Sequence, residues 1–272
     1  MDESCDPDLA AVAGFYDNIL ALELLMGENL HLGYWPEGSG GSLSEAQHRL
    51  TDLIATSIRA DSTSRVLDIG CGTGAPARRI ALMTGAHITG VTISRQQAET
   101  ASERSAAAGL AERTKFLIED AMDLSLSDAS FDRAFAIESI VHMPEKEHAM
   151  REIVRVLRPG GRLAIADVVL LPSQDVVGVQ SAGESTFRLL APETAESYGE
   201  LVRDAGFEVE ETRDLTDQTR PSYEHCVRRI QENRSALVAA IGSDRTTALD
   251  NLMSLFARTR QIGYLLLVAV KR

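Results

Sequence analysis

The sequence predicts an α/β fold in which a doubly wound, mostly parallel sheet of seven strands is covered by helices and closed by a helical lid. The first observation is an alternation of short apolar runs with helical patterns between residues 61 and 217, which is typical of parallel sheets with right-handed crossovers. The second is that both flanks, residues 1–60 and 218–262, have helical patterns that break this alternation. A chain of 272 residues is long enough for one such domain with an appendage.

Each expected strand is an apolar or β-branched run bounded by turn residues. Ser94 is expected to cap a helix that starts at Arg95, because its hydroxyl can accept from the unpaired amides of the first turn. Pro144 suits the first turn of a helix that continues to Leu157, and the following "RPGG" ends that helix. In chain order the expected strands are Arg65–Gly70, His87–Ile93, Thr114–Asp120, Phe131–Glu138, Arg162–Leu170, Glu208–Thr216 and Gly263–Lys271.

These elements divide the chain into a core and several lid segments. Ligands of open α/β sheets bind at the carboxyl ends of the strands, near the point where the strand order reverses, so the lid segments are expected to shape a pocket there. The predicted division is an N-terminal helical lid segment (1–60), a ligand-binding core (61–171), a lid insertion (172–191), a core helix and strand (192–217), a helical lid segment (218–262) and a last core strand (263–272).

Composition excludes several classes of function. The formal net charge of −13 disfavours nucleic acid and anionic membranes as partners, because both require basic patches. No apolar run is long enough to cross a bilayer, and the acidic start "MDESCDPD" is unlike a signal peptide, so a cytoplasmic protein is expected. The cysteines Cys5, Cys71 and Cys226 are widely spaced and suit reduced thiols, and no metal-ligand spacing occurs. The helical amino terminus leaves a homo-oligomer open.

The stretch "VLDIGCGTGAP", residues 66–76, places a glycine-rich turn between a strand and a helix. Gly70, Gly72 and Gly74 are spaced G-x-G-x-G, unlike the G-x-G-x-x-G of dinucleotide-binding folds, and no Lys-Ser/Thr pair follows as in a P-loop. Asp68 would repel a diphosphate, whereas it could hold a cationic amino group. The loop therefore predicts a ligand that carries positive charge, and the alternative is a strand–turn–helix hinge without a ligand.

This stretch resembles the first motif of class I S-adenosylmethionine-dependent methyltransferases, and the likeness continues through Leu171. "GENLHLGYW", "EDAMDL", "HMPE" and "VLRPGGRLAIADVVLL" are similar to small-molecule enzymes of actinobacterial natural-product pathways, in particular the rebeccamycin sugar O-methyltransferase group. The resemblance implies a Rossmann-like core, S-adenosylmethionine as cofactor and S-adenosylhomocysteine as its product. The lack of metal-ligand spacing predicts no metal requirement.

The resemblance also implies which residues hold the cofactor. The three glycines would close over its methionyl part, and Asp68 would help to anchor its amino group. Many class I enzymes bind the ribose hydroxyls with an acid after the second strand, whereas this chain has neutral side chains there. The residues that would contact the adenosine part or support the pocket wall are Thr92, Ile93 and Gln97 for the ribose, Asp120 and the Ala121 amide for the adenine, and Glu138 for the wall.

The reacting end is expected after the fourth and fifth strands. Methyl transfer to a hydroxyl needs alignment, exclusion of water and removal of a proton, and imidazole is suited to accept that proton near neutral pH. His142 is therefore the predicted base, and Asp167 is its predicted helper. The rebeccamycin-like pattern has two adjacent histidines where this chain has Val141 and His142, so one imidazole is missing.

Aromatic and histidine side chains of the N-terminal segment are predicted to close over the methionyl and substrate sites, and the alternative is ordinary packing of lid against core. These residues are Tyr16, His31, Tyr34 and Trp35.

The sequence thus predicts an enzyme that methylates a hydroxyl of a small secondary metabolite, such as a glycoside or a polyketide-like compound. N- or C-methylation is the first alternative, because an amine needs little help from a base. A nicotinamide-dependent oxidoreductase is disfavoured by Asp68 and by Thr92. A domain that binds the cofactor without turning it over is the third alternative.

Overall fold

The computed structural model describes residues 18–37, 39–171 and 193–272, and the predicted lid insertion and Tyr16 lie outside these residues. Seven strands form one sheet in the order β3-β2-β1-β4-β5-β7-β6, in which only β7 runs antiparallel to its neighbours. The predicted fold class is confirmed. The strands are β1 (Arg65–Ile69), β2 (His87–Thr92), β3 (Thr114–Ile118), β4 (Phe131–Ile137), β5 (Leu157–Leu170), β6 (Phe207–Asp214) and β7 (Ile262–Lys271).

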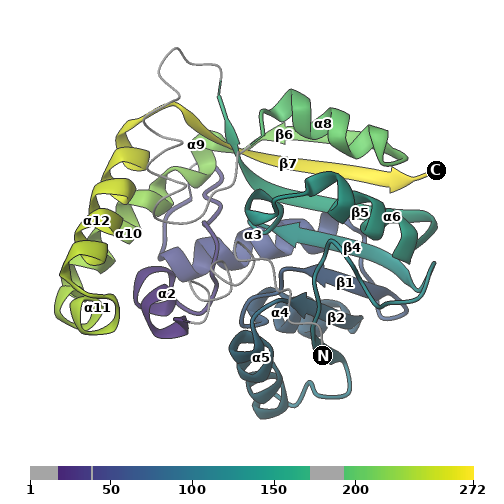
Figure 1. Cartoon of the computed structure of the whole chain (residues 1–272), viewed down its shortest axis with the longest axis horizontal. Helices are drawn as coiled ribbons and strands as arrows, with labels where there is room; N and C mark the ends of the chain where they lie inside the picture. The colour runs from purple at the N-terminus through teal and green to yellow at the C-terminus, as the bar shows by residue number, and fades with distance from the viewer. Residues whose placement is uncertain (1–17, 38, 172–192) are drawn as a thin grey trace, which may run out of the picture.

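Helices cover both faces of this sheet and one of its ends (Figure 1). The helices that precede or connect the parallel strands are α2 (Ile19–Met26), α3 (Leu43–Ser57), α4 (Ala75–Thr84), α5 (Arg95–Ala107), the 3₁₀ turn η1 (Ile140–His142), α6 (Lys146–Val156) and α8 (Ala195–Asp204). Between β6 and β7 lie α9 (Thr216–Thr219), α10 (Pro221–Glu232), α11 (Arg234–Ile241) and α12 (Ser243–Arg258).

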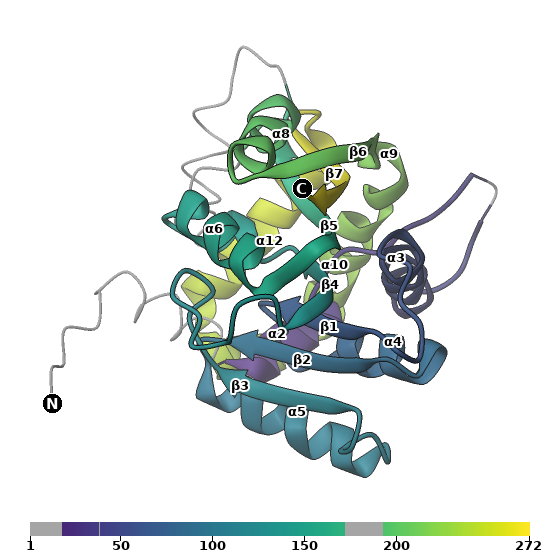
Figure 2. The ribbon, with the colours of Figure 1, turned by 90° about the vertical axis from the view of Figure 1, so that its right-hand side faces the viewer.

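Alternate residues of the central strands enter two separate apolar cores. Val66 of β1 and Phe135 of β4 belong to the core with α3 and α4, whereas Leu67 and Ala134 belong to the core with α6 and α8. Figure 2 shows α3 and α4 on one side of the sheet and α6 on the other. Successive side chains of a strand point to opposite faces, so a sheet buried on both faces needs apolar runs without alternation, which the sequence supplies.

A group of helices (α2, α10, α11 and α12) packs together beyond the carboxyl ends of the parallel strands. In Figure 1 the arrow of β7 points away from this group, so the parallel strands end beside it. The predicted lid segment 218–262 thus contains α10, α11 and α12. The segment 1–60 is divided, because α3 packs on α4 and β5 as part of the layer over the sheet, and only α2 joins the helical group.

Two local expectations need correction and one is confirmed. β5 starts at Leu157 instead of Arg162, because Leu157 pairs with Phe131 before an irregularity in the register. Pro144 lies before the N-cap Glu145 of α6 and outside the first turn. The predicted cap Ser94 is confirmed, because its hydroxyl accepts from the Gln97 amide at 3.1 Å.

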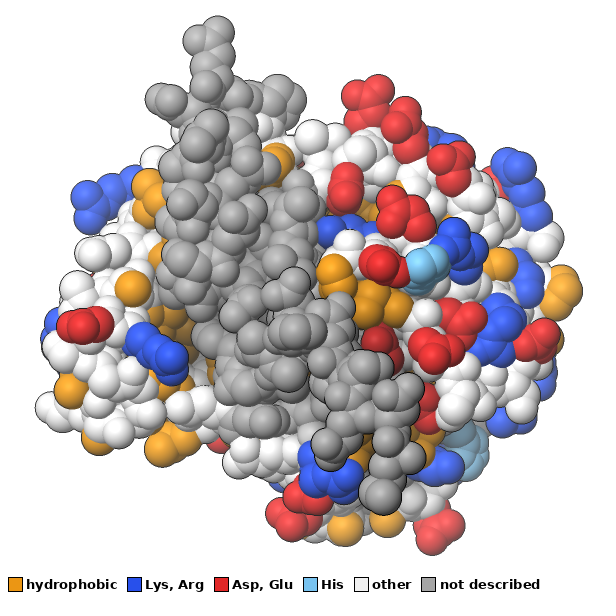
Figure 3. Space-filling view, in the orientation of Figure 1, with side chains coloured by type: hydrophobic (Ala, Val, Ile, Leu, Met, Phe, Trp, Pro, Cys, Tyr) orange, Lys and Arg blue, Asp and Glu red, His pale blue; other side chains and the backbone are white. Residues whose placement is uncertain are grey.

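The surface agrees with the acidic composition. Figure 3 shows acidic side chains, with some basic ones among them, over the region of α6 and α8. No helix within the described ranges is long and apolar enough to cross a membrane.

A buried amide fixes the segment between α2 and α3 that reaches the site. The Nε2 of Gln47, which is 1% exposed on α3, donates to the carbonyls of Met26, Asn29 and His31 at 3.0, 2.7 and 2.7 Å. Carbonyls that lose a donor while buried cost free energy, so this contact holds the segment against the core.

Replacement of Gln47 by Leu keeps the side-chain size and removes the donor. We expect Gln47→Leu to lower the free energy of unfolding by about 2 kcal/mol, because buried carbonyls are left unsatisfied. Urea unfolding followed by the fluorescence of Trp35, the single tryptophan, measures this change. The exposed Thr56→Ala on the same helix serves as control and should cost under about 0.5 kcal/mol. Equal unfolding midpoints for Gln47→Leu and the wild type would contradict the assigned role.

Candidate functional site

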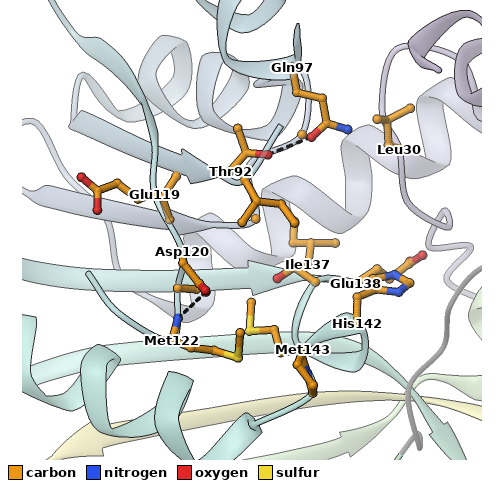
Figure 4. Close-up of a pocket in the computed structure, with 17 residues that line it drawn as sticks. Leu30, Thr92, Gln97, Glu119, Asp120, Met122, Ile137, Glu138, His142 and Met143 are labelled. Carbon is orange, nitrogen blue, oxygen red and sulfur yellow. Dashed lines mark hydrogen bonds between the residues drawn. The ribbon is translucent and has the colours of Figure 1, made fainter. Parts of the chain in front are cut away.

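A cavity opens where β1, β2, β3 and β4 end (Figure 4), and its space, part of which is open to solvent, is about 900 Å³. A smaller one of about 320 Å³ adjoins it beneath the glycine loop, and Leu30, Gly70, Gly72 and Ile137 line both. The other residues of the large cavity are Val91, Thr92, Ile93, Gln97, Glu119, Asp120, Ala121, Met122, Glu138, Ser139, His142, Met143 and Pro144.

The glycine loop follows β1 and makes room for these cavities. Gly70, Gly72 and Gly74 have φ angles of +73°, +51° and +75°, a region that L side chains rarely adopt. A Cβ at Gly70 would lie 2.4 Å from the Cβ of Ser139, and one at Gly74 would lie 2.7 Å from the Phe116 ring. The predicted glycines are therefore required by the backbone conformation, and at Gly70 and Gly74 also by close packing.

Asp68 is buried on β1 at the floor of the smaller cavity, with 2% of its surface exposed. Within the described residues its Oδ2 atom has no hydrogen-bond partner. Burial raises the pKa of this carboxyl well above its ordinary value. A buried carboxylate oxygen without a partner among the described residues, next to a cavity, suits a cationic donor, and the binding of an amino group by Asp68 stays a prediction.

The end of β2 carries polar groups without charge. The Thr92 hydroxyl donates to the side-chain oxygen of Gln97 at 3.0 Å and accepts from the Ser94 amide at 3.2 Å (Figure 4). Both Thr92 and Gln97 are buried, and with Ile93 they line the large cavity. The structure brings these three predicted residues together, and their contact with a ribose stays a prediction.

Asp120 and Ala121 follow β3 and also line the cavity. Asp120 Oδ1 accepts from the Met122 amide at 2.9 Å (Figure 4). The backbone of Asp120 also forms an isolated antiparallel β-bridge with that of Asp123. The residue is thus part of a local turn and of the cavity wall at once. The adenine contacts of Asp120 and Ala121 stay predictions.

Glu138 stands at the end of β4 in a backbone conformation unusual for its type, with φ +49°. Its Oε1 atom accepts from the Leu32 amide at 2.7 Å and from the Tyr264 hydroxyl at 2.8 Å. Burial raises the pKa of this carboxyl to about 8, and the charge of Asp167 adds to the effect. Glu138 therefore joins β4, β7 and the segment before α3 at the wall of the cavity.

His142 ends the turn η1 and lines the same cavity (Figure 4). Its predicted helper has a different place. Asp167 is fully buried, and its Oδ2 accepts from the Val141 amide at 3.0 Å and the Tyr198 hydroxyl at 2.8 Å, while Oδ1 accepts from the Val168 amide at 2.8 Å. Within the described residues these bonds go to groups other than the His142 imidazole. Asp167 thus bonds to the backbone of the turn that carries His142, and its role as helper of His142 stays a prediction.

The predicted lid residues divide between the cavity and the core. His31 is 2% exposed, lines the smaller cavity, and bonds through Nδ1 to the Leu32 carbonyl at 2.7 Å. Burial lowers the pKa of this imidazole to about 4.

Tyr34 and Trp35 line neither cavity. Tyr34 packs against the core, and Trp35 stacks on His225 with ring centroids 5.3 Å apart. For these two residues the packing alternative is the better description.

Several residues of the site escaped the sequence analysis. Tyr198 on α8 and Tyr264 on β7 are buried, and their hydroxyls donate to Asp167, 31 positions away in the chain, and to Glu138, 126 positions away. Buried tyrosines need a partner for the hydroxyl, which is the signal that could have identified them. Part of the apolar wall of the large cavity is formed by Leu30, Met122 and Met143. No group of three or more metal-ligating side chains occurs in the described part of the chain, and the absence of a metal requirement stays a prediction.

Comparison with known proteins gives consistent results. A family model described as "Methyltransferase domain" matches residues 67–165. The 27-O-demethylrifamycin SV methyltransferase of Amycolatopsis mediterranei is 38% identical over 255 residues, 92% of each chain. Methyltransferase GfsG of Streptomyces halstedii is 43% identical over 219 residues, 78% of this chain and 77% of GfsG. The solved structure of the [4+2]-cyclase SpnF is 32% identical with a TM-score of 0.85, and the match covers 96% of this chain and 94% of SpnF.

The burial of Asp167 predicts a dependence of stability on pH. Burial raises its pKa from 3.8 to about 6, so between these pH values the folded state binds more protons than the unfolded state. The free energy of unfolding should therefore fall as pH rises from about 4 to about 6, by on the order of 2 kcal/mol more in the wild type than in Asp167→Asn. Urea unfolding at several pH values measures this difference. The exposed Asp204→Asn is the control and should follow the wild type, whereas parallel curves for Asp167→Asn would contradict the assignment.

Proposed function

Since the chain belongs to the class I S-adenosylmethionine-dependent methyltransferases, we propose that it methylates a hydroxyl of a small secondary metabolite, such as a glycoside or a polyketide-like compound. The observation that carries the proposal is the unpartnered buried oxygen of Asp68 beneath the glycine loop. Relatives of this chain include a methyltransferase named for 27-O-demethylrifamycin SV, which supports an acceptor from secondary metabolism.

The residues of the two cavities fit the cofactor. Asp68 would hold the α-amino group in the smaller cavity, and the backbone at Gly70 and Gly72 would lie against the methionyl part, where no Cβ occupies the space. Thr92 and Gln97 would contact the ribose, and Asp120 and the Ala121 amide would contact the adenine. When bound, S-adenosylmethionine supplies a methyl group on a positively charged sulfonium. The carboxyls along both cavities favour such a ligand and disfavour a diphosphate.

The chain's own contribution to the reaction is alignment and proton removal. His142 lines the large cavity on a turn whose Val141 amide donates to Asp167, and its side chain is only partly buried. We assign His142 as the general base that accepts the proton of the acceptor hydroxyl. A fixed base at a cavity wall reduces the entropy that must be lost before transfer.

Two alternatives remain for the test. N- or C-methylation would need less help from a base, so it suits a site with one imidazole. A protein that binds the cofactor without methyl transfer is favoured by one observation, namely that a chain 32% identical over nearly its whole length is described as a [4+2]-cyclase. Calorimetric titration with S-adenosylhomocysteine, with NADH in parallel, tests the cofactor, and transfer of labelled methyl groups to 27-O-demethylrifamycin SV and to simpler hydroxyl and amine acceptors tests the reaction.

Loss of the charge of Asp68 should weaken cofactor binding. We expect Asp68→Asn to raise the Kd of S-adenosylhomocysteine about tenfold to a hundredfold, because a charge-assisted hydrogen bond is lost. Calorimetry gives the Kd directly, and Asp204→Asn, on the surface at the end of α8, should leave it unchanged. An unaltered Kd in Asp68→Asn would exclude Asp68 from the binding site, and binding of NADH alone would refute the cofactor itself.

Removal of the imidazole should affect turnover and spare binding. We expect His142→Ala to lower kcat for a hydroxyl acceptor by about a hundredfold or more, as is usual for loss of a general base. The Kd of S-adenosylhomocysteine should stay near that of the wild type. His148→Ala, an exposed histidine of α6, is the matched control. If His142→Ala methylates hydroxyl acceptors at the rate of the wild type, His142 is not the general base. If the variant loses activity on hydroxyl acceptors and keeps it on amine acceptors, His142 serves O-methylation alone.

A further inference from the structure

We propose that Glu138 makes the site selective for charge, so that it binds S-adenosylmethionine in preference to the neutral S-adenosylhomocysteine and takes up a proton when the positive charge disappears. The inference rests on the proposed function and goes beyond it, because it assigns to one residue the discrimination between cofactor and product.

The position of Glu138 follows from the two cavities. The large cavity would hold the adenosine part, and the smaller one would hold the amino acid part. Ile137 lines both, and Glu138 is the next residue along the chain. A ligand with one end in each cavity passes through their junction, and in S-adenosylmethionine the sulfonium is the atom that links the two ends. Glu138 itself lines the large cavity, so we place its carboxyl beside the positive charge of the bound cofactor.

The hydrogen bonds of Glu138 leave one oxygen for this purpose. Among the residues that the structure describes, Glu138 has two hydrogen-bond donors, the Leu32 amide and the Tyr264 hydroxyl, and both donate to Oε1. The residue is partly exposed and lines the large cavity, so we infer that Oε2 is the oxygen available to a ligand. The left-handed backbone at φ +49° is a conformation that costs free energy in a residue other than glycine, and such strain is often found where a side chain is aimed at a ligand.

The charges around Glu138 determine when it titrates. Burial raises its pKa to about 8, so it is mostly protonated at pH 7 before a ligand binds. A cation at short distance favours the carboxylate, so binding of the sulfonium should expel this proton. After methyl transfer the thioether is neutral, and the carboxyl takes a proton back. Over one turnover His142 accepts one proton from the acceptor hydroxyl and Glu138 takes one up, while Glu138 has released one on binding the cofactor, so the net release is the single proton that the methylation of a hydroxyl requires.

Other titratable side chains near Glu138 differ in their charge at pH 7 to 8. Burial raises the pKa of the Tyr264, Tyr223 and Cys226 side chains and lowers that of His31, so these stay neutral near pH 7 to 8, while Asp167, with a pKa of about 6, is ionised there. Asp68 faces the amino acid part, which both ligands share. His142 shares the cavity and is unchanged in the variants compared here. The difference between the two ligands therefore isolates the group next to sulfur.

The test needs no acceptor. Calorimetry at pH 6.5 to 8.5 yields the Kd of S-adenosylmethionine and of S-adenosylhomocysteine for the wild type and for Glu138→Gln, whose amide keeps the size and the Oε1 acceptor. As pH rises toward 8, we expect the wild type to bind S-adenosylmethionine increasingly better than S-adenosylhomocysteine. The ratio of the two Kd values should change by up to about tenfold per pH unit more in the wild type than in Glu138→Gln. Glu119→Gln, which removes a carboxylate at the other side of the same cavity, is the matched control and should keep the dependence of the wild type.

A second variant keeps the test valid if Glu138→Gln fails to fold. Tyr264→Phe removes a donor that stabilises the carboxylate, so the transition in the ratio should move to higher pH. A purely structural role of Tyr264 would leave the transition where it is. Identical pH dependence in the wild type, Glu138→Gln and Tyr264→Phe would overturn the inference while leaving the proposed function intact. Absence of S-adenosylhomocysteine binding to the wild type would overturn both.

Discussion

The close approach of the loop after β1 to its neighbours is the constraint on which the site depends. At Gly70 and Gly74 the backbone lies so near Ser139 and Phe116 that a Cβ would overlap them, and both residues have left-handed φ angles. The chain can therefore turn from β1 into α4 without filling the space above the strand ends. The missing side chains let Ser139 and Phe116 pack against the loop, and the loop in turn forms part of the wall of both cavities through Gly70 and Gly72. Everything else in the site is arranged around that space by the strands next to β1.

Electrostatics then selects the ligand. Asp68 on β1, Glu138 at the end of β4 and Asp167 on β5 are carboxyls whose pKa burial raises, in a chain of net charge −13. Ionised carboxylates in a medium of low polarity are costly unless a cation or several donors accompany them. Asp167 has its donors within the protein. Asp68 has an oxygen without one, so the fold retains a cost that a cationic ligand would offset.

The sequence predicted the parts of the molecule that local patterns determine. The strands, the cap at Ser94 and the glycine loop follow from residue types at fixed spacing, and each was found where expected or within a few residues. Contacts between distant segments were not predictable in this way. The pairing of Asp167 with Tyr198, and of Glu138 with Tyr264 and Leu32, depends on which elements the topology brings together. The role of α3 was misjudged for the same reason, because an amphipathic helix fits a lid and a covering layer equally well.

Glu138 and Asp167 illustrate how two adjacent strands assign different tasks to the same side-chain type. Asp167 is sealed by three donors that occupy both of its oxygens, so its carboxylate can orient the turn of His142 without meeting a ligand. Glu138 has donors on one oxygen only, and it lines the cavity. The charge of Asp167 also disfavours ionisation of Glu138. A carboxylate that is already satisfied on β5 thus keeps its neighbour on β4 near the point of titration, where the charge of a bound ligand can decide its protonation state.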